Sequence, residues 1–269
     1  MKALILVGGL GTRLRPLTFS IPKPLLPVGE KPILQIIIEQ LREANVRELI
    51  LATGYQAELI QAFCGDGSKF GVKIDYVKED LPLGTAGPLS LIRERFEADE
   101  YCLLMNGDIL TRLDFGAFIE TSRKYGCDLT VVYKQYVYRS PFGVLTVKDG
   151  LVEDIHEKPA QEYLVSAGIY CVKATALQLV PDGKLFTVPD LIRKLIGRGK
   201  KVAAYHIKEQ WLGLESIDHF EEALKRVNGA LEDPQDEVLP DHIADQQREH
   251  TVEFRNEDSG ATHQLLFTR

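Results

Sequence analysis

The chain has 269 residues, of which 45% are hydrophobic and 26% are charged, and its formal net charge is −7. This length and apolar content can support one large core, alone or with a small appendage. The lack of a basic excess argues against nucleic acid as a partner, and no run approaches the ~18 apolar residues of a membrane span. No cleavable leader precedes the first predicted strand, so we expect no membrane association and a cytoplasmic location.

The first predicted element is a buried strand at residues 3–7, an unbroken apolar run that ends at Gly8-Gly9. Glycines at the carboxyl end of such a strand lie where open α/β sheets bind ligands, and they let backbone N–H groups approach phosphates or a base. Two familiar phosphate loops are excluded, because the dinucleotide fingerprint needs a glycine where Leu14 stands and the P-loop needs Gly-Lys-Ser/Thr. A glycine turn alone is equally consistent with an ordinary loop.

Two cations make this segment more specific. Arg13 lies inside the glycine turn, and Lys23 lies between Pro22 and Pro24. A guanidinium binds phosphate oxygens in pairs, a lysine acts as a point charge, and the flanking prolines reduce the entropy lost when Lys23 is fixed. We therefore predict that residues 8–27 bind a nucleoside triphosphate; the alternative is a solvated Lys23 in a plain turn.

The segment GGLGTRLRPLTFSIPKPLLP resembles the signature of the sugar-1-phosphate nucleotidyltransferases, the pyrophosphorylase family that makes NDP-sugars. Further motifs of that family recur in order to about residue 226. The resemblance implies a nucleotide-binding α/β fold, a divalent metal such as Mg²⁺, and a reaction of an NTP with a sugar 1-phosphate to give an NDP-sugar and pyrophosphate. It implies nucleotide contacts at Leu6, Gly8, Gly9, Gly11, Thr12, Gly84 and Thr85.

Strands and helices alternate through the first half of the chain. This order predicts an α/β fold, a Rossmann-like three-layer α/β/α arrangement around a mixed, mainly parallel sheet. The helix after Pro32 is marked by apolar residues at helical spacing. The predicted helices cover residues 33–41, 57–64, 87–96 and 115–125, and the predicted strands cover 48–53, 72–77 and 101–105.

Small residues dominate the string PLGTAGPL at positions 82–89. They would let a flat base approach the backbone, and Thr85 would either contact the base or cap the following helix. The string is more similar to guanylyltransferases for mannose-type or heptose-type sugar phosphates than to thymidylyltransferases. The expected substrates are therefore GTP and a mannose-type sugar phosphate.

Asp108 follows the buried strand at 101–105 within Asn106-Gly107-Asp108. A carboxylate at that position projects into the same crevice as the glycine loop, where a Mg²⁺ ion that bridges phosphates needs a hard ligand. By itself such an Asp is more often a turn residue. The resemblance makes it the metal aspartate.

Closely spaced strands then replace the alternation, at 129–132, 143–147, 152–155 and 165–172, with a hairpin turn at Asp149-Gly150. This close spacing of strands predicts a small sugar-binding β region. Gly143, Glu157 and Lys158 match the family's aromatic-Gly-Val and E-K-P motifs, which contact sugar hydroxyls and the sugar phosphate. Ser166 stands where the family has an Asn that binds the sugar. Without the resemblance, a Glu-Lys pair on a hairpin would be read as solvated.

The segment Trp211 to Ser216 departs from the family. Relatives commonly carry W-x-D-I-G there, with the Asp as a second metal ligand, and this chain has Gly213 at that position. Glu215, two residues further on, is the candidate replacement because its longer side chain can reach the same ion; the alternative is a purely structural role for Glu215. Asp218 is expected in the first turn of a helix that Ser216 caps.

The last 39 residues, 231–269, hold 10 acidic and 3 basic side chains and so carry the whole net charge. We predict a catalytic domain at 1–230 and an acidic extension at 231–269. Strand-like runs at 251–254 and 264–267 predict a small hairpin that docks on the domain or on a second subunit of a homo-oligomer. The four cysteines are scattered and are expected to be buried free thiols.

The sequence thus predicts a nucleotidyltransferase in which Arg13, Lys23 and Asp108 carry the chemistry and Asp108 and Glu215 hold the metal. One alternative is a thymidylyl-, uridylyl- or cytidylyltransferase of the same fold. Another is a regulatory homologue that binds an NDP-sugar without turnover, which Gly213 favours and the intact cations oppose.

Overall fold

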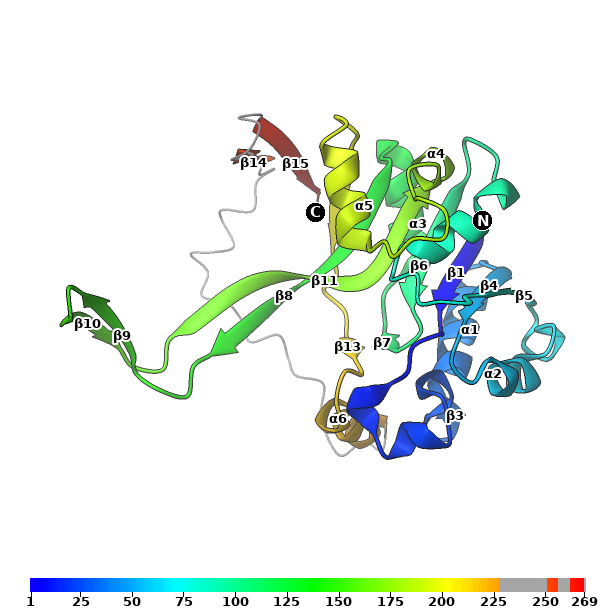
Figure 1. Ribbon diagram of the computed structural model, residues 1–269, viewed down its shortest axis with the longest axis horizontal. Coiled ribbons are helices and arrows are strands. Elements are labelled where there is room, and N and C mark those ends of the chain that lie inside the picture. The colour runs from blue at the N-terminus through cyan, green and yellow to red at the C-terminus, as the bar shows by residue number, and fades with distance from the viewer. Residues whose placement is uncertain (228–250, 256–261, 269) are drawn as a thin grey trace.

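A nine-stranded sheet, in the order β14-β15-β12-β8-β11-β6-β1-β4-β5, crosses the computed structural model, which describes residues 1–227, 251–255 and 262–268 (Figure 1). The strands β6, β1, β4 and β5 are parallel neighbours, and β8, β12 and β15 are also parallel. β11 runs antiparallel between β6 and β8, and β14 runs antiparallel to β15. The predicted mixed, mainly parallel sheet is confirmed. Its strands are β1 (Lys2–Leu6), β4 (Glu48–Thr53), β5 (Lys73–Lys78), β6 (Tyr101–Asn106), β8 (Leu129–Arg139), β11 (Ala160–Lys173), β12 (Val202–His206), β14 (Thr251–Arg255) and β15 (Thr262–Thr268).

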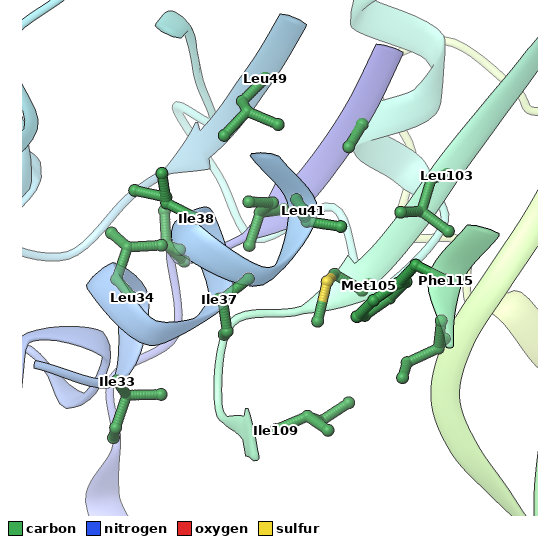
Figure 2. Close-up of a cluster of buried hydrophobic side chains, with 14 of the residues drawn as sticks. Ile33, Leu34, Ile37, Ile38, Leu41, Leu49, Leu103, Met105, Ile109 and Phe115 are labelled. Atoms are coloured by element: carbon green, nitrogen blue, oxygen red, sulfur yellow. The ribbon is translucent and has the colours of Figure 1, made fainter. Parts of the chain in front are cut away.

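Helices cover both faces of this sheet, which confirms the three-layer prediction. Successive strand residues point to opposite faces of the sheet. Ile5 of β1 packs on the face covered by α1 (Ile33–Glu43), α2 (Ala57–Cys64), α3 (Phe115–Tyr125) and α6 (Ile217–Val227). Its neighbour Leu4 packs on the other face, which is covered by α4 (Ala174–Leu177) and α5 (Val188–Ile196). Figure 2 shows the apolar stripe of α1 against side chains of β6 and α3.

Local sequence explains where two of these helices begin. Asp114 precedes α3, and its side chain accepts a hydrogen bond of 2.9 Å from the Ala117 N–H. Thr187 and Asp190 form a reciprocal capping box at the start of α5. No predicted element covers this helix, although the Thr-x-x-Asp pattern is a signal for its start.

The predicted helix at 87–96 is wrong. The chain forms two 3-10 turns instead, η5 (Gly87–Leu91) and η6 (Arg93–Arg95), separated by Ile92 at φ −124°. The Ser90 hydroxyl donates to the Gly87 carbonyl at 2.7 Å and so competes for an acceptor that a regular α-helix would use.

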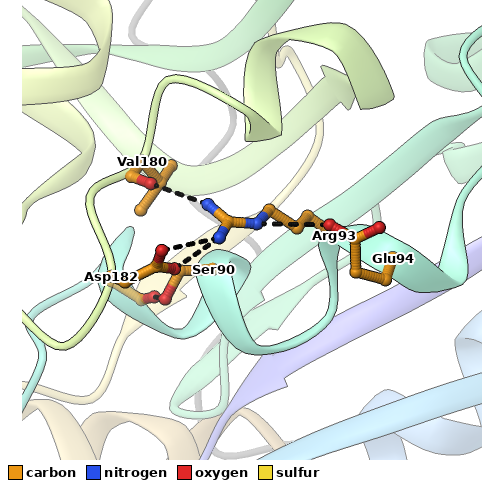
Figure 3. Close-up of polar contacts among 6 residues, drawn as sticks. Ser90, Arg93, Glu94, Val180 and Asp182 are labelled. Atoms are coloured by element: carbon orange, nitrogen blue, oxygen red, sulfur yellow. Dashed lines mark hydrogen bonds and ion pairs between the residues drawn. The ribbon is translucent and has the colours of Figure 1, made fainter.

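Arg93 fastens these turns to the segment after α4 (Figure 3). Its Nη2 donates to both carboxylate oxygens of Asp182, at 2.6 and 2.7 Å, and its Nη1 donates to the Val180 carbonyl at 3.3 Å. The hydrogen bonds that the guanidinium donates to Asp182 raise its pKa. The neighbouring N–H groups of Ala86 and Gly87 both donate to the Phe186 carbonyl, so this contact region supports the loop at 83–87.

A long two-stranded ribbon leaves the sheet between β12 and β6. β8 and β11 stay paired from Leu129 and Val172 out to Arg139 and Ala160, and the hairpin of β9 (Val144–Lys148) and β10 (Leu151–His156) lies at the tip (Figure 1). We call residues 134–166 the arm. The strands predicted at 129–132 and 165–172 are too short. The pairing of β8 with β11 continues through exposed residues, which lack the buried apolar pattern that predicts a strand. The predicted turn at Asp149-Gly150 is confirmed, with φ of 51° and 82°.

The remaining elements are short and lie outside the main sheet. They are η1 (Thr12–Leu14), η2 (Leu17–Phe19), η3 (Lys23–Leu25), β2 (Pro27–Val28), β3 (Lys31–Pro32), η4 (Ser68–Phe70), β7 (Ile109–Thr111) and β13 (Trp211–Gly213). β13 pairs antiparallel with β7, which brings the segment after Trp211 to the end of β6.

All four cysteines are free and buried, as predicted. Burial raises the pKa of Cys64 and of Cys171 to about 12 and raises that of Cys102 and Cys127 as well. The thiols therefore act as packed apolar groups. Within residues 1–227, 251–255 and 262–268, no helix has the length and apolarity to cross a bilayer.

Candidate active site at the carboxyl edge of the sheet

A cleft of about 710 Å³ lies at the carboxyl ends of β6, β1, β4 and β5. These strands are parallel neighbours, so the residues that follow them meet at one edge of the sheet. The cleft brings together every residue predicted to bind nucleotide or metal or to carry the chemistry: Leu6, Gly8, Gly9, Gly11, Thr12, Arg13, Lys23, Gly84, Thr85, Asp108 and Glu215.

The glycine loop after β1 combines one strained position with one open position. Gly11 has φ +60°, and a Cβ there would lie 2.9 Å from Thr18 Cγ2. The Thr18 hydroxyl donates to the Gly11 carbonyl at 2.8 Å, which fixes the turn. Gly9 differs, because a Cβ on it would meet nothing within 4 Å and would project into free space. Gly11 is thus required by the fold, whereas Gly9 leaves room beside the cleft.

Lys23 and Asp108 form an ion pair in the cleft. Lys23 opens η3 directly after Pro22, and Asp108 follows β6. The two side chains are only 14% and 22% exposed, so solvent screens their attraction less than it does at an open surface. Lys23, which is predicted to bind phosphate, thus contacts Asp108, which is predicted to bind the metal.

Arg13 and Glu215 form a second ion pair, with Nη1 and Oε2 2.6 Å apart. Glu215 reaches the cleft because the Leu214 N–H donates to the Asp108 carbonyl at 3.0 Å, in continuation of the β7–β13 ladder. Glu215 Oε2 is enclosed yet accepts no well-aligned hydrogen bond. The Arg13 side chain is 73% exposed, so this contact is a weak one that a ligand can replace.

Ser216 and Asp218 serve the helix that follows. The His219 N–H donates to the Ser216 hydroxyl at 3.3 Å, and Asp218 lies in the first turn of α6. The predicted cap is confirmed. Gly213 pairs with Ile109 in β7, beside Asp108.

Gly84 and Thr85 form the opposite wall of the cleft. Gly84 has φ +77°, and a Cβ there would lie 2.8 Å from the Phe186 carbonyl oxygen. The Thr85 hydroxyl accepts a hydrogen bond of 2.9 Å from the Val188 N–H, so it caps the distant helix α5 and not the segment next to it in sequence. The hydrogen bond to Thr85 therefore connects this wall of the cleft to the start of α5.

The predicted sugar-phosphate residues lie on the arm or at its base and do not line this cleft. Gly143 and Glu157 are neighbours, because a Cβ on Gly143 would lie 3.1 Å from Glu157 Oε2. Lys158 follows at φ 44°, and Ser166 shares a hydrogen bond of 2.8 Å with the Tyr170 hydroxyl. Figure 1 shows the arm directed away from the body of the protein. The structure groups Gly143 with Glu157 and leaves them apart from Lys23.

Sequence reasoning missed Glu79, which also lines the cleft. Burial raises the pKa of its carboxyl group, an effect that a hydrogen bond from the Leu83 N–H partly offsets. A single acid after a strand has no local signature. The placement of ligands at the carboxyl ends of parallel strands was the signal that could have found it, once β5 was predicted.

Comparison with protein-family models finds one match, to the family described as "Nucleotidyl transferase", over residues 2–229. Probable mannose-1-phosphate guanylyltransferase 1 of Oryza sativa subsp. japonica is 40% identical over 187 residues, which are 67% of this chain and 52% of that protein. UTP–glucose-1-phosphate uridylyltransferase of Synechocystis is 32% identical over 246 residues, which are 84% of this chain and 63% of that protein. The chain thus spans about half the length of the rice relative.

The crystal structure of HddC from Yersinia pseudotuberculosis is similar in fold. It matches with a TM-score of 0.67 and 26% sequence identity, over 84% of this chain and 99% of that chain.

Proposed function

Because the chain belongs to the nucleotidyl transferase family, we propose that it converts an NTP and a sugar 1-phosphate into an NDP-sugar and pyrophosphate. GTP with a mannose-type sugar phosphate is the pair best supported, since the rice relative carries that name. The observation that carries the proposal is the joining of the glycine loop, Lys23, Asp108, Arg13 and Glu215 in one cleft. A nucleoside triphosphate needs this combination of backbone donors, cations and hard carboxylates.

The reaction requires positioning and charge stabilisation more than a protein nucleophile. An oxygen of the sugar phosphate attacks the α-phosphorus of the NTP, the bond from that phosphorus to the β-phosphate oxygen breaks, and pyrophosphate leaves with the electron pair. In this proposal Arg13 braces the triphosphate and stabilises the leaving pyrophosphate. Lys23 neutralises the α-phosphate, where charge builds up during the attack.

Two carboxylates of the cleft fit a divalent cation such as Mg²⁺. The Glu215 Oε2 atom is enclosed without an aligned donor, and Asp108 offers oxygens at the end of β6. Among the described residues no group of three or more His, Cys, Asp or Glu could hold a metal, so the ion would also need substrate oxygens and waters, as Mg²⁺ usually does. When bound, it would neutralise phosphate charge and orient the triphosphate. Lys23 and Arg13, released from their carboxylates, would then bind phosphate.

The sugar phosphate is assigned to Gly143, Glu157, Lys158 and Ser166, with Lys158 as the neutralising cation. This assignment rests on the sequence motifs and requires the arm to approach the cleft. At the base of the arm the β8–β11 register shifts between Ser166 and Tyr170, and Gly168 there has φ +72°. A register shift of this kind bends a strand.

Pyrophosphate release over a matrix of four NTPs and common sugar 1-phosphates tests the proposal. We expect release to require both substrates and Mg²⁺ and to be fastest with GTP and mannose 1-phosphate. Fastest release with UTP or dTTP would instead establish one of the related transferase activities. Failure of every pair would contradict the proposal.

A regulatory protein that binds an NDP-sugar without turnover is the second candidate, because Gly213 replaces a metal ligand common in relatives. It is distinguished by GDP-mannose binding in equilibrium dialysis together with no turnover in the matrix. The paired cations of the cleft favour the enzyme.

A further inference from the structure

The loop after β4 contacts the glycine loop at two separate points. Near its start, the Tyr55 N–H donates to the Gly8 carbonyl at 3.2 Å, and a Cβ built on Gly54 would lie 2.9 Å from the same Gly8 oxygen. Near its return, Gln56 Nε2 donates to the Phe19 carbonyl at 3.1 Å. Three consecutive residues after β4 therefore hold both the beginning and the return of the glycine loop.

Gln56 adopts a backbone conformation that disfavours glutamine. It precedes α2 with φ 52° and ψ 38°, in the left-handed region. Its amide oxygen is enclosed and accepts no hydrogen bond from the described residues, which adds a desolvation cost. A glycine at this position would avoid both costs, and such strain persists only where the surrounding structure imposes it. The contact with Phe19 is what glutamine provides here and glycine does not.

The contact with Phe19 bears on the turn that carries Arg13. Phe19 ends η2, and the buried Thr18 before it donates from its hydroxyl to the Gly11 carbonyl at 2.8 Å. The same carbonyl accepts a hydrogen bond of 2.9 Å from the Leu14 N–H, which closes the turn around Arg13. Movement of Phe19 would therefore be transmitted through Thr18 to the backbone of that turn.

The rigidity of this turn affects how well a triphosphate is held. The Arg13 side chain is 73% exposed, so its position depends on the backbone that carries it. If the loop had to become ordered when the nucleotide binds, the lost entropy would reduce the affinity. We propose that Gln56 is a positioning residue that fixes the return of the glycine loop at Phe19 and so holds Arg13 in place for the triphosphate. This inference rests on the proposed function for the identity of the ligand.

Replacement of Gln56 by glycine separates the role in the loop from the stability of the fold. Gln56→Gly relieves the left-handed conformation and removes the enclosed amide oxygen, so the midpoint of urea denaturation should not fall. Without the contact at Phe19, hydrogen exchange measured by mass spectrometry should become faster in residues 12–22 and stay unchanged in β1 and β4. This measurement needs no nucleotide. Wild-type exchange throughout residues 12–22 would overturn the inference.

Binding and kinetics measure the consequence for the ligand. In Gln56→Gly, the dissociation constant of GTP with Mg²⁺, measured by calorimetry without sugar phosphate, should rise about 10-fold, as for loss of one hydrogen bond that keeps the loop ordered. The KM for GTP in pyrophosphate release should rise by a similar factor, whereas the KM for the sugar phosphate should not change. Wild-type GTP affinity in a variant with a loosened loop would also overturn the inference.

Two further variants control for strain and for side-chain size. Asn45 also has a left-handed backbone, with φ 61°, and it is exposed after the end of α1. Asn45→Gly relieves the same kind of strain away from the loop, so it should change neither the exchange of residues 12–22 nor the GTP affinity. Gln56→Glu keeps the length of the side chain and replaces the donor to Phe19 by an acceptor, so it should loosen the loop as Gln56→Gly does. Weaker GTP binding in Asn45→Gly, or wild-type exchange in Gln56→Glu, would contradict the role of the hydrogen bond.

The same measurements distinguish this inference from the proposed function. A wild-type protein that binds GTP without turnover, and in which Gln56→Gly loosens the loop and weakens binding, would refute the proposed function and support the role of Gln56. If the wild-type protein bound no nucleotide, the proposed function would fail, and the exchange of residues 12–22 would still decide whether Gln56 holds the loop.

Discussion

At the scale of single residues, the cleft pairs each predicted phosphate-binding cation with a predicted metal-binding carboxylate, Lys23 with Asp108 and Arg13 with Glu215. Arg13, Lys23 and Asp108 could be predicted because they lie in a long local motif or directly after a buried strand. Glu79 has no local signature, since its carboxylate lies beside Gly8, which follows a different strand of the sheet.

Loss of either cation should weaken turnover more than folding. We expect Arg13→Ala and Lys23→Ala each to lower kcat/KM by about 10²-fold or more, the usual effect of losing a preorganised charge contact in a transition state. Steady-state pyrophosphate release, with circular dichroism to confirm folding, measures this. Near-normal turnover in a folded variant would remove that residue from the mechanism.

Two glycines of the same loop should respond in opposite ways. Gly11→Ala places a Cβ at φ +60° and 2.9 Å from Thr18 Cγ2, so it should cost about 1–2 kcal/mol of stability. Gly9→Ala places a methyl group in open space, so stability should change by less than about 0.5 kcal/mol while kcat/KM falls about 10-fold or more because the nucleotide is displaced. Urea denaturation and kinetics of both variants provide the comparison. Normal kinetics in Gly9→Ala would show that no ligand approaches that position.

Glu215 replaces the missing metal ligand in our account, and Mg²⁺ titration tests this. Glu215→Gln keeps the shape of the side chain and removes its charge, so it should raise the Mg²⁺ concentration needed for half-maximal turnover and lower the maximal rate. The matched variant Asp218→Asn changes an exposed carboxylate in the first turn of α6, and it should cost about 0.5 kcal/mol or less and leave the titration unchanged. A wild-type titration curve for Glu215→Gln would refute this assignment.

At the scale of elements, the parallel half of the sheet and its helices followed from sequence because each has a strong apolar period. The helices at 57–64 and 115–125 match α2 and α3 residue for residue. The helix predicted at 87–96 is replaced by 3-10 turns, in which the Ser90 hydroxyl donates to the Gly87 carbonyl. The full length of the arm could not be predicted, since its strands pair with each other and not with the core.

The arm exposes an unusual amount of apolar surface for a ribbon that stands alone. Its exposed apolar residues include Tyr136, Tyr138, Phe142, Leu145, Leu151, Ile155 and Leu164. Such a surface is expected to be covered in the working state. We expect it to close over the cleft of its own chain, because the proposed sugar-phosphate contacts of Glu157 and Lys158 require the arm to reach the cleft.

Mixing two inactive variants distinguishes closure within one chain from exchange between two chains. Lys23→Ala damages the cleft and Lys158→Ala damages the arm. If each arm serves its own cleft, a mixture of the two proteins, unfolded and refolded together, should show no more activity than the sum of the separate variants. Activity well above that sum would show that the arm of one copy completes the cleft of another, and each variant refolded with wild type serves as the control.

At the scale of the whole molecule, the family model matches residues 2–229, and β14 and β15 lie beyond it at the edge of the sheet beside β12. We therefore keep, as a proposal, a catalytic domain at 1–230 and an acidic extension at 231–269. The charge imbalance predicted the division from sequence. The parallel pairing of β15 with β12 could not be predicted, because it joins residues about sixty positions apart.

Truncation after Asn228 should leave kcat/KM close to that of the full chain, because none of the cleft residues lies beyond Glu215. It should also expose β12 as an edge strand and so increase self-association. Kinetics and light scattering of the shortened protein measure the two effects. A folded, monodisperse truncation without activity would show that the extension belongs to the active site.

The fate of an isotopic label tests the central claim, that the cleft joins the two substrates at the α-phosphorus. Mannose 1-phosphate labelled with ¹⁸O in its phosphate oxygens is incubated with GTP, Mg²⁺ and the protein, and the products are analysed by mass spectrometry. Our account predicts that all of the label is retained in GDP-mannose and that an equal amount of unlabelled pyrophosphate is released. Label in pyrophosphate or orthophosphate, or no GDP-mannose at all, would contradict it.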